Sequence, residues 1–309
     1  MLRVSPVLLT LLICTVSVRP ATAQYYINQT ELAEILQPCG TNLDAIPDVH
    51  YLYYVLYSSR PNNVLARNTM YKVLGQGDLA IGRKRAKLVG VLNRTLLPFV
   101  AIGDTLVIPD QFDIDFCAYS PFPRYYPGSK DFDKIFIIDK HIQAWAAYDF
   151  GKLARWGIVS TGGKESRTPK GRFNFNWKTK YRVSSLSPPG EPWEMYWVFN
   201  FVESRGIHIH QYAMPTGGPQ SHGCVRLVED DAKWVYDWAS GWKRNAAGKI
   251  LRQGTTVLVI GDEPKNKPSP FISKARYPVL RKVVLPENPY DVPPGEEQQR
   301  HFDRLRGTH

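Results

Sequence analysis

The stretch that decides the fold and the chemistry reads GIHIH at residues 206–210 and SHGCVR at residues 221–226. The first part alternates apolar residues with histidines, which is typical of a strand with one buried face. A Pro/Gly-rich stretch, residues 214–219, then leads to Cys224, just before an expected helix. A thiolate is the reactive form of cysteine, and an imidazole within hydrogen-bond distance can accept the thiol proton. The sequence therefore predicts a nucleophilic cysteine site.

Three further motifs flank this stretch: STG at residues 160–162, TPKGRF at 168–173 and GTTV at 254–257. Together with SHGCVR they resemble the YkuD-type L,D-transpeptidases, whose signature is a histidine on a strand, then Ser/Thr-His-Gly-Cys, then Asn or Arg two residues later. The resemblance covers residues 131–262. It implies a mainly β fold: a β-sandwich catalytic domain with one helix after the catalytic cysteine, preceded by a small α/β module.

The resemblance also implies the reaction. Cys224 attacks the amide after the L-centre of the diamino acid in a peptidoglycan tetrapeptide stem and expels the terminal D-amino acid. An amine of a second stem then resolves the thioester, and neither metal nor cofactor is required. Water as the acceptor would give an L,D-carboxypeptidase, and an envelope protein would give an anchoring enzyme; the residues do not separate these acceptors.

Two histidines are candidates for the catalytic base. A gap-free comparison with the commonest family pattern selects His208, whereas the wider register from Trp197 to Met214 selects His210. The two side chains are expected on the same face of a strand, about 6.6 Å apart. The preferred base is His210, with a backbone carbonyl near Gln211 expected to orient its ring.

The remaining residues of the signature have expected roles beside Cys224. The amides of Gly223 and Cys224 are candidate donors to a developing oxyanion. His222 is expected to be structural, with its ring bonded to the backbone of the loop. Ser221 either orients the loop or is an incidental turn residue, and Arg226 either binds a substrate carboxylate or pairs with an acid.

Two other classes of protein compete with this interpretation. His208, His210, His222 and Cys224 form a set of ligand types suited to zinc, as in a zinc-dependent hydrolase. Zinc leaves the STG and TPKGRF motifs unexplained. A non-catalytic cell-wall-binding protein is the third class, and the presence of Cys224 argues against it.

The N-terminus has the pattern of a secretory signal. Arg3 is followed by an apolar run at residues 7–18 and by the small-x-small pattern at 21–23, so residues 1–23 are expected to be removed. No later stretch approaches the about 20 apolar residues of a membrane-spanning helix. The mature chain, from Gln24 on, is expected to be exported to the periplasm or cell wall and not to span a membrane.

The mature chain holds Cys39, Cys117 and Cys224. An odd count in an oxidising compartment implies one disulfide and one free thiol, or no disulfide. Cys39 and Cys117 are the natural pair.

The 309-residue chain has a formal net charge of +11 and a pI near 9.4. This charge indicates an anionic partner or a well-solvated basic surface. Nucleic acid fits poorly with export, whereas peptidoglycan stem peptides in the cell envelope fit well. The sequence sets no oligomeric state.

The N-terminal region, residues 24–130, is predicted to form a module and a connection. A helix is expected at 83–92, and IGDTLVIP at 102–109 reads as a turn and a strand. With Leu92-Asn93, this ending resembles the second half of a LysM glycan-binding repeat, so residues 51–109 are the LysM-like segment; an ordinary packing module is the alternative.

Beyond residue 130, strand patterns precede and follow one amphipathic helix at 228–239. The strands are expected at 134–139, 143–148, 155–160, 196–202, 206–210 and 255–260. From 263 to 309 the prolines predict an extended tail without regular strand pairing.

Overall fold

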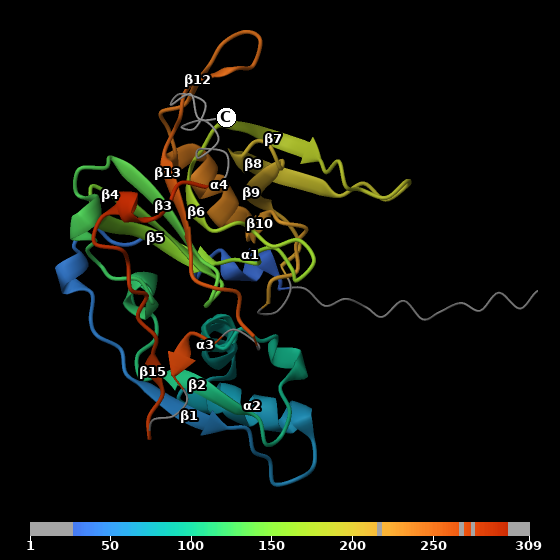
Figure 1. The fold of residues 1–309 in the computed structure, drawn as a ribbon. Helices are drawn as coiled ribbons and strands as arrows, with labels where there is room; N and C mark the ends of the chain where they lie inside the picture. The colour runs from blue at the N-terminus through green and yellow to red at the C-terminus, as the bar shows by residue number, and fades with distance from the viewer. Residues whose placement is uncertain (1–26, 215–217, 266–268, 273–275, 296–309) are drawn as a thin grey trace, which may run out of the picture.

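The computed structural model describes residues 27–214, 218–265, 269–272 and 276–295. The expected signal segment, residues 1–23, lies outside this part of the chain. Figure 1 shows two layers of sheet in the upper part of the molecule and a smaller helical unit below them. The mainly β architecture expected from the sequence is confirmed.

The half of the chain that follows residue 133 is built around strand β3 (Lys134–Asp139), which is buried on both faces. Side chains alternate across a strand, so Ile135 and Ile137 enter one core while Phe136 and Ile138 enter the other. Because both faces of β3 are covered, its sequence is a continuous apolar run, and the strand lies between the two cores.

Two sheets form the sandwich. The five-stranded sheet has, in spatial order, β5 (Lys152–Ile158), β4 (Ala144–Asp149), β3, β13 (Thr256–Ile260) and β6 (Gly171–Asn174). The four-stranded sheet has the order β10 (Val225–Leu227), β9 (Ile207–Gln211), β8 (Glu194–Val202) and β7 (Trp177–Val183). Their facing side chains, with those of helix α4 (Glu229–Trp238), form one core.

Helix α4 follows β10 directly and packs on β8 and β9. Its buried stripe holds Ala232 and Val235, as the spacing predicted. Asp231 in its first turn is fully buried and pairs with Arg155 of β5, with Nη2 and Oδ1 2.7 Å apart. Burial raises the pKa of Asp231 to about 6. This pair ties the helix after Cys224 to the other sheet.

The N-terminal unit has the order strand, helix, helix, strand. Strands β1 (Tyr51–Val55) and β2 (Thr105–Pro109) pair antiparallel, with helices α2 (Asn63–Leu74) and α3 (Leu79–Leu92) between them in sequence. The four elements contribute to a small core of their own. Helix α2 begins at Asn62, whose side chain caps the amides of Val64 and Leu65.

The remaining elements are short. They are α1 (Gln29–Leu32), β11 (Lys243–Arg244), β12 (Ile250–Arg252), β14 (Phe271–Ile272), β15 (Val279–Leu280) and the 3-10 turns η1 (Leu43–Ala45), η2 (Leu97–Phe99), η3 (Phe116–Tyr119), η4 (Pro127–Ser129) and η5 (Pro289–Asp291). In the described part of the chain, no helix has the length and apolar composition needed to cross a membrane.

The expectation that the tail lacks strand pairing is wrong. Strands β14 and β15 pair antiparallel, and the Gly295 amide donates to the Arg172 carbonyl at 2.9 Å. Pro270 and Pro278 stand just before the paired residues rather than within them, so the paired positions keep their amide hydrogens.

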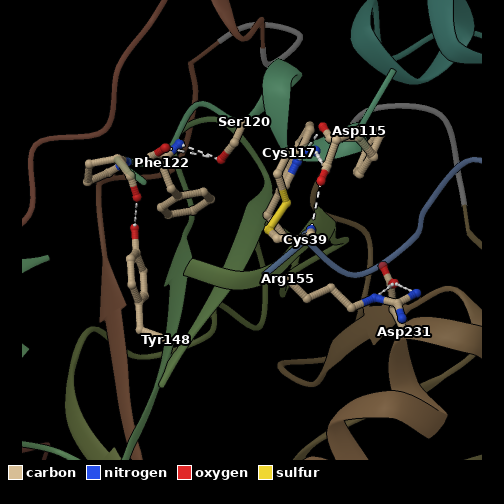
Figure 2. The surroundings of a disulfide bond; sticks show 12 residues. Cys39, Asp115, Cys117, Ser120, Phe122, Tyr148, Arg155 and Asp231 are labelled. Carbon is tan, nitrogen blue, oxygen red and sulfur yellow. Dashed lines mark hydrogen bonds and ion pairs between the residues drawn. A yellow bond between two sulfur atoms is a disulfide. The ribbon is translucent and has the colours of Figure 1, made fainter. Parts of the chain in front are cut away.

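A disulfide joins Cys39 to Cys117, with a Cα–Cα distance of 5.4 Å, and confirms the expected pair (Figure 2). The surrounding backbone is held as well: the Cys39 amide donates to the Ala154 carbonyl at 2.9 Å, and the Gly40 amide donates to Asp115 at 2.7 Å. The disulfide therefore fastens the first described segment to the turn at residues 116–119, and the Cys39 amide fastens it to strand β5. Cys224 is the free cysteine among the described residues.

Thiol titration of the unfolded, unreduced mature protein is expected to find one free thiol. Replacing both Cys39 and Cys117 by alanine should lower the free energy of unfolding by about 2–4 kcal/mol, because the bond restricts the unfolded chain. Three titratable thiols in the unreduced protein would contradict the bridge.

Candidate active site

Strands β9 and β10 bring the predicted site residues together. On β9, Ile207 and Ile209 enter the sandwich core, so His208 and His210 point to the opposite face. Strand β10 pairs parallel to β9 with Val225 opposite Ile209. Cys224, one residue before β10, therefore lies next to His208.

The thiol contacts one imidazole, and the other imidazole is fixed by the backbone. Cys224 Sγ lies 3.8 Å from His208 Nδ1 and 3.9 Å from the Gly206 carbonyl oxygen. The Nδ1 atom of His210 lies 2.9 Å from the Gln211 carbonyl oxygen, where the sequence placed the orienting partner. In contrast, His208 Nε2 is buried and has no hydrogen-bond partner among the described residues.

Burial sets the protonation of all three groups. It lowers the pKa of His208 to about 3, and it lowers the pKa of His210 to about 4 although the bond to Gln211 opposes the shift. Burial also raises the pKa of the Cys224 thiol, against the opposing effects of the His208 backbone and of Arg226 and Arg182. At neutral pH the site therefore holds a neutral Cys224 thiol beside the neutral imidazoles of His208 and His210.

This protonation state predicts a pH profile for acylation of Cys224. The rate should fall only below about pH 4, where His210 becomes protonated. It should rise in the alkaline range as the thiolate forms. Single-turnover acylation measured across pH tests this. An acid limb centred near the ordinary imidazole pKa of about 6.5 would contradict the assigned environment.

The two candidate oxyanion donors are the amides of Gly223 and Cys224, at the end of the loop before β10. The Gly223 amide donates to Ser221 Oγ at 3.1 Å, and that hydroxyl in turn donates to the Cys224 carbonyl. Of the two candidate oxyanion donors, Gly223 is therefore already engaged, and the Cys224 amide remains. Gly223 has φ +111°, which favours glycine.

His222 and Arg226 are each two residues from Cys224 in sequence, and each contacts an aromatic ring. The exposed His222 ring stacks on Trp193, with centroids 5.0 Å apart, rather than bonding to the loop backbone as expected. Arg226 Nη1 donates to the Ala213 carbonyl at 3.4 Å, and its guanidinium lies over the Tyr212 ring.

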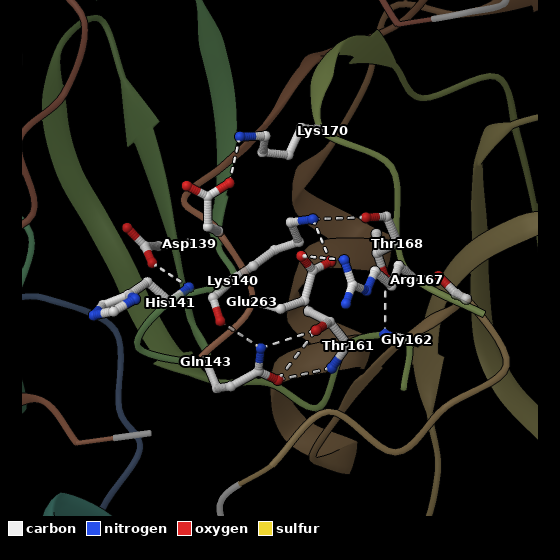
Figure 3. Close-up of polar contacts among 12 residues, drawn as sticks. Asp139, Lys140, His141, Gln143, Thr161, Gly162, Arg167, Thr168, Lys170 and Glu263 are labelled. Carbon is white, nitrogen blue, oxygen red and sulfur yellow. Dashed lines mark hydrogen bonds and ion pairs between the residues drawn. The ribbon is translucent and has the colours of Figure 1, made fainter. Parts of the chain in front are cut away.

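The STG and TPKGRF motifs, together with Ser166 between them, support this loop. Ser166 Oγ donates to the His222 carbonyl at 2.8 Å, and Thr168 Oγ1 donates to the Gly223 carbonyl at 2.8 Å while accepting from the Gly162 amide at 2.9 Å. Behind them, buried Lys140 donates to the Thr168 carbonyl and pairs with Glu263 at 2.6 Å (Figure 3). Two hydroxyls therefore hold the carbonyls that precede Cys224.

Replacing Thr168 by valine should slow acylation of Cys224 by roughly tenfold or more, because it leaves two buried backbone groups without their partner and loosens the loop. Thr179→Val on β7 is the matched control. The measurement is the single-turnover rate together with the melting temperature. An unchanged rate in Thr168→Val would contradict the supporting role.

A cleft opens at the thiol, and it is called the Cys224 cleft below. Its lining residues are Arg182, Ser184, Ser185, Leu186, Trp193, Met195, Arg205, Gly206, His208, His210, Tyr212, Ser221, His222, Cys224 and Arg226. Every site residue predicted from the sequence lines it except Gly223, which lies in the loop beneath. Arg182 and Trp193, on the hairpin of β7 and β8, were missed because no motif marks them.

The geometry does not support the zinc alternative. No group of three or more His, Cys, Asp or Glu side chains within the described ranges is arranged to hold a metal ion. His222, one of the four proposed ligands, uses its ring to stack on Trp193 instead.

Comparison with known families identifies the domain. Residues 133–259 match the family model of the L,D-transpeptidase catalytic domain, YkuD. The match is confined to these residues and covers less than half of the chain.

Solved structures similar to this chain include L,D-transpeptidases. One from Mycobacterium smegmatis is 20% identical, with 41% of this chain and 58% of that chain covered and a TM-score of 0.34. One from Stackebrandtia nassauensis is 24% identical, with 43% and 58% covered and a TM-score of 0.35. The chain thus spans less than two thirds of their length. No curated protein matched the sequence.

Proposed function

We propose that this chain is an exported peptidoglycan L,D-transpeptidase, a cysteine acyltransferase that uses Cys224. The observation that carries the proposal is the Cys224 cleft: a free thiol lies 3.8 Å from an imidazole, next to a second imidazole, on a domain of the matching family. A non-catalytic wall-binding protein would need none of these features. Water as the acceptor would make the same site an L,D-carboxypeptidase.

The reaction follows from the contacts. The thiol loses its proton to an imidazole, and its sulfur attacks the amide carbon after the L-centre of the stem's diamino acid. The Cys224 amide stabilises the oxyanion. The C–N bond breaks, the imidazole returns the proton to the departing D-amino acid, and a C–S thioester remains. An acceptor amine then attacks the thioester, forms a new C–N bond and releases the thiol.

We assign the proton transfer to His210. Protonated His210 would have both N–H groups satisfied, one by the Gln211 carbonyl and the other by the thiolate. Protonated His208 would bury an Nε2–H without an acceptor, which costs about 1–3 kcal/mol or more. The contact distance favours His208, but hydrogen bonds of catalytic groups are often formed only with substrate bound.

Muropeptide analysis tests the function. Purified protein is incubated with peptidoglycan sacculi, with Cys224→Ala as the control. The proposal predicts cross-links between the L-centre of one stem and the side-chain amine of another. Tripeptide products alone would make the enzyme a carboxypeptidase, and no change in the sacculi would refute the function.

The N-terminal unit favours a second, auxiliary function in glycan binding. Its loops at 56–62 and 97–104 lie side by side, since the Gly103 amide donates to the Leu56 carbonyl at 2.9 Å. They expose Tyr57 and the apolar side chain of Ile102, and an aromatic ring such as that of Tyr57 is suited to stacking on a sugar. Sedimentation with sacculi should weaken in Tyr57→Ala and stay unchanged in Tyr277→Ala; equal binding by both variants would refute this site.

A further inference from the structure

The Cys224 cleft carries positive charge without any negative charge. Three arginines line it: Arg182 from β7, Arg205 from the turn between β8 and β9, and Arg226 from β10. None of the described lining residues is an Asp or a Glu. His208 and His210 add no charge at neutral pH, because burial lowers the pKa of both.

Acids near the cleft are engaged elsewhere. Glu203 pairs with Arg244 at 3.0 Å, and Glu194 accepts from the Tyr181 hydroxyl at 3.0 Å. Neither carboxylate lines the cleft, so neither offsets the arginines there. A cleft with one sign of charge concentrates ligands of the opposite sign.

Arg182 and Arg205 are exposed and lie outside the family motifs. Arg182 rests on the Trp177 ring, with its guanidinium carbon 5.3 Å from the centroid, and Trp177 in turn contacts His208 edge-on. Arg205 Nη2 donates to the Arg167 carbonyl at 3.4 Å, which leaves most of its donors available. Both guanidiniums are therefore held at the rim and retain donors for a ligand.

We propose that Arg182 and Arg205 make the Cys224 cleft selective for acyl donors with free carboxylates beside the scissile amide, that is, for stem peptides that are not amidated. The inference rests on the proposed function and adds its substrate class. A planar guanidinium binds a carboxylate through two parallel hydrogen bonds. Amidation of the glutamyl or diamino-acid carboxylate removes the charge and one acceptor, so an amidated stem loses this interaction.

Arg182 also has a simpler possible effect, since its charge favours the Cys224 thiolate. That effect would change the reactivity of the thiol towards every reagent equally. Selection for carboxylates would change only the reactivity towards anions. A pair of reagents that differ in charge alone separates the two effects.

The first test is alkylation of Cys224 by iodoacetate and by neutral iodoacetamide. The ratio of the two rates should fall roughly three- to tenfold in Arg182→Gln and in Arg205→Gln, as expected for loss of one nearby charge. Lys249→Gln, an exposed residue outside the cleft, is the matched control and should keep the ratio. An unchanged ratio in both arginine variants would overturn the proposal.

The second test compares two tetrapeptide donors, one with free and one with amidated carboxylates. The proposal predicts a higher kcat/KM for the free donor, expressed mainly in KM, and loss of the preference in the Arg182→Gln/Arg205→Gln double variant. Equal or better use of the amidated donor would overturn the selectivity. Turnover of neither peptide would contradict the proposed function instead, and the alkylation ratio would still decide the role of the arginines.

Discussion

Replacing Cys224 by alanine will abolish transpeptidation, because both acyl transfers pass through a thioester on this sulfur. Cys224→Ser will fail as well, since a serine hydroxyl is far less acidic than a thiol, whose pKa is ordinarily about 8.5. The measurement is product formation from a tetrapeptide donor and an amine acceptor. Each variant should be at the background level of the assay.

Loss of activity supports the mechanism only if both variants still fold. Cys224 is only partly buried, and its backbone, not its sulfur, holds the loop through Ser221. The melting temperatures of both variants should therefore stay close to that of the parent protein. Full activity in either variant would rule out the cysteine mechanism.

Replacing His210 by alanine will slow acylation by roughly a hundredfold or more, the usual contribution of a positioned acid–base group. His208→Ala should cost much less. The asymmetry follows from the orientation of the rings: the Gln211 carbonyl fixes the tautomer of His210, whereas His208 Nε2 has no acceptor among the described residues.

Single-turnover acylation by a carbapenem, a strained acyl donor, measures both variants across pH. Loss of the acid limb in His210→Ala would identify His210 as the base. A strongly reduced acylation rate in His208→Ala, with a nearly unchanged rate in His210→Ala, would overturn the assignment. The 3.8 Å contact between Cys224 Sγ and His208 Nδ1 would then be the catalytic one.

Local patterns predicted the central elements of the fold. The apolar run of β3, the alternation of β9 and the amphipathic pattern of α4 each encode burial within a few residues, and each element was found within two residues of its expected bounds. Strand β5 was placed too late by about three residues at its start, where Lys152 and Leu153 extend it.

Elements that depend on their partners were missed. Strand β10 has three residues and β6 has four, too few to show a period. Strand β7 is at the edge of its sheet and largely polar, so its sequence alone does not distinguish it from a loop.

The residues of the candidate site likewise fall into those that a local motif predicts and those that only the tertiary fold brings together. Cys224, His208 and His210 stand in two short motifs of one family signature, at 206–210 and 221–226, so their meeting could be predicted. Arg182 and Trp193 reach the cleft only because the hairpin of β7 and β8 folds over it, and the supporting hydroxyl of Ser166 acts through a contact 56 residues away. Contacts of this kind arise from the tertiary fold and leave no local pattern.

Intact-protein mass spectrometry during incubation with a tetrapeptide donor, without acceptor, tests the central claim most directly. The proposed mechanism predicts a covalent adduct equal to the donor minus its terminal D-amino acid, located on Cys224 after proteolysis and released by an added amine. An adduct on another residue, or none while the donor is consumed, would contradict acyl transfer through Cys224.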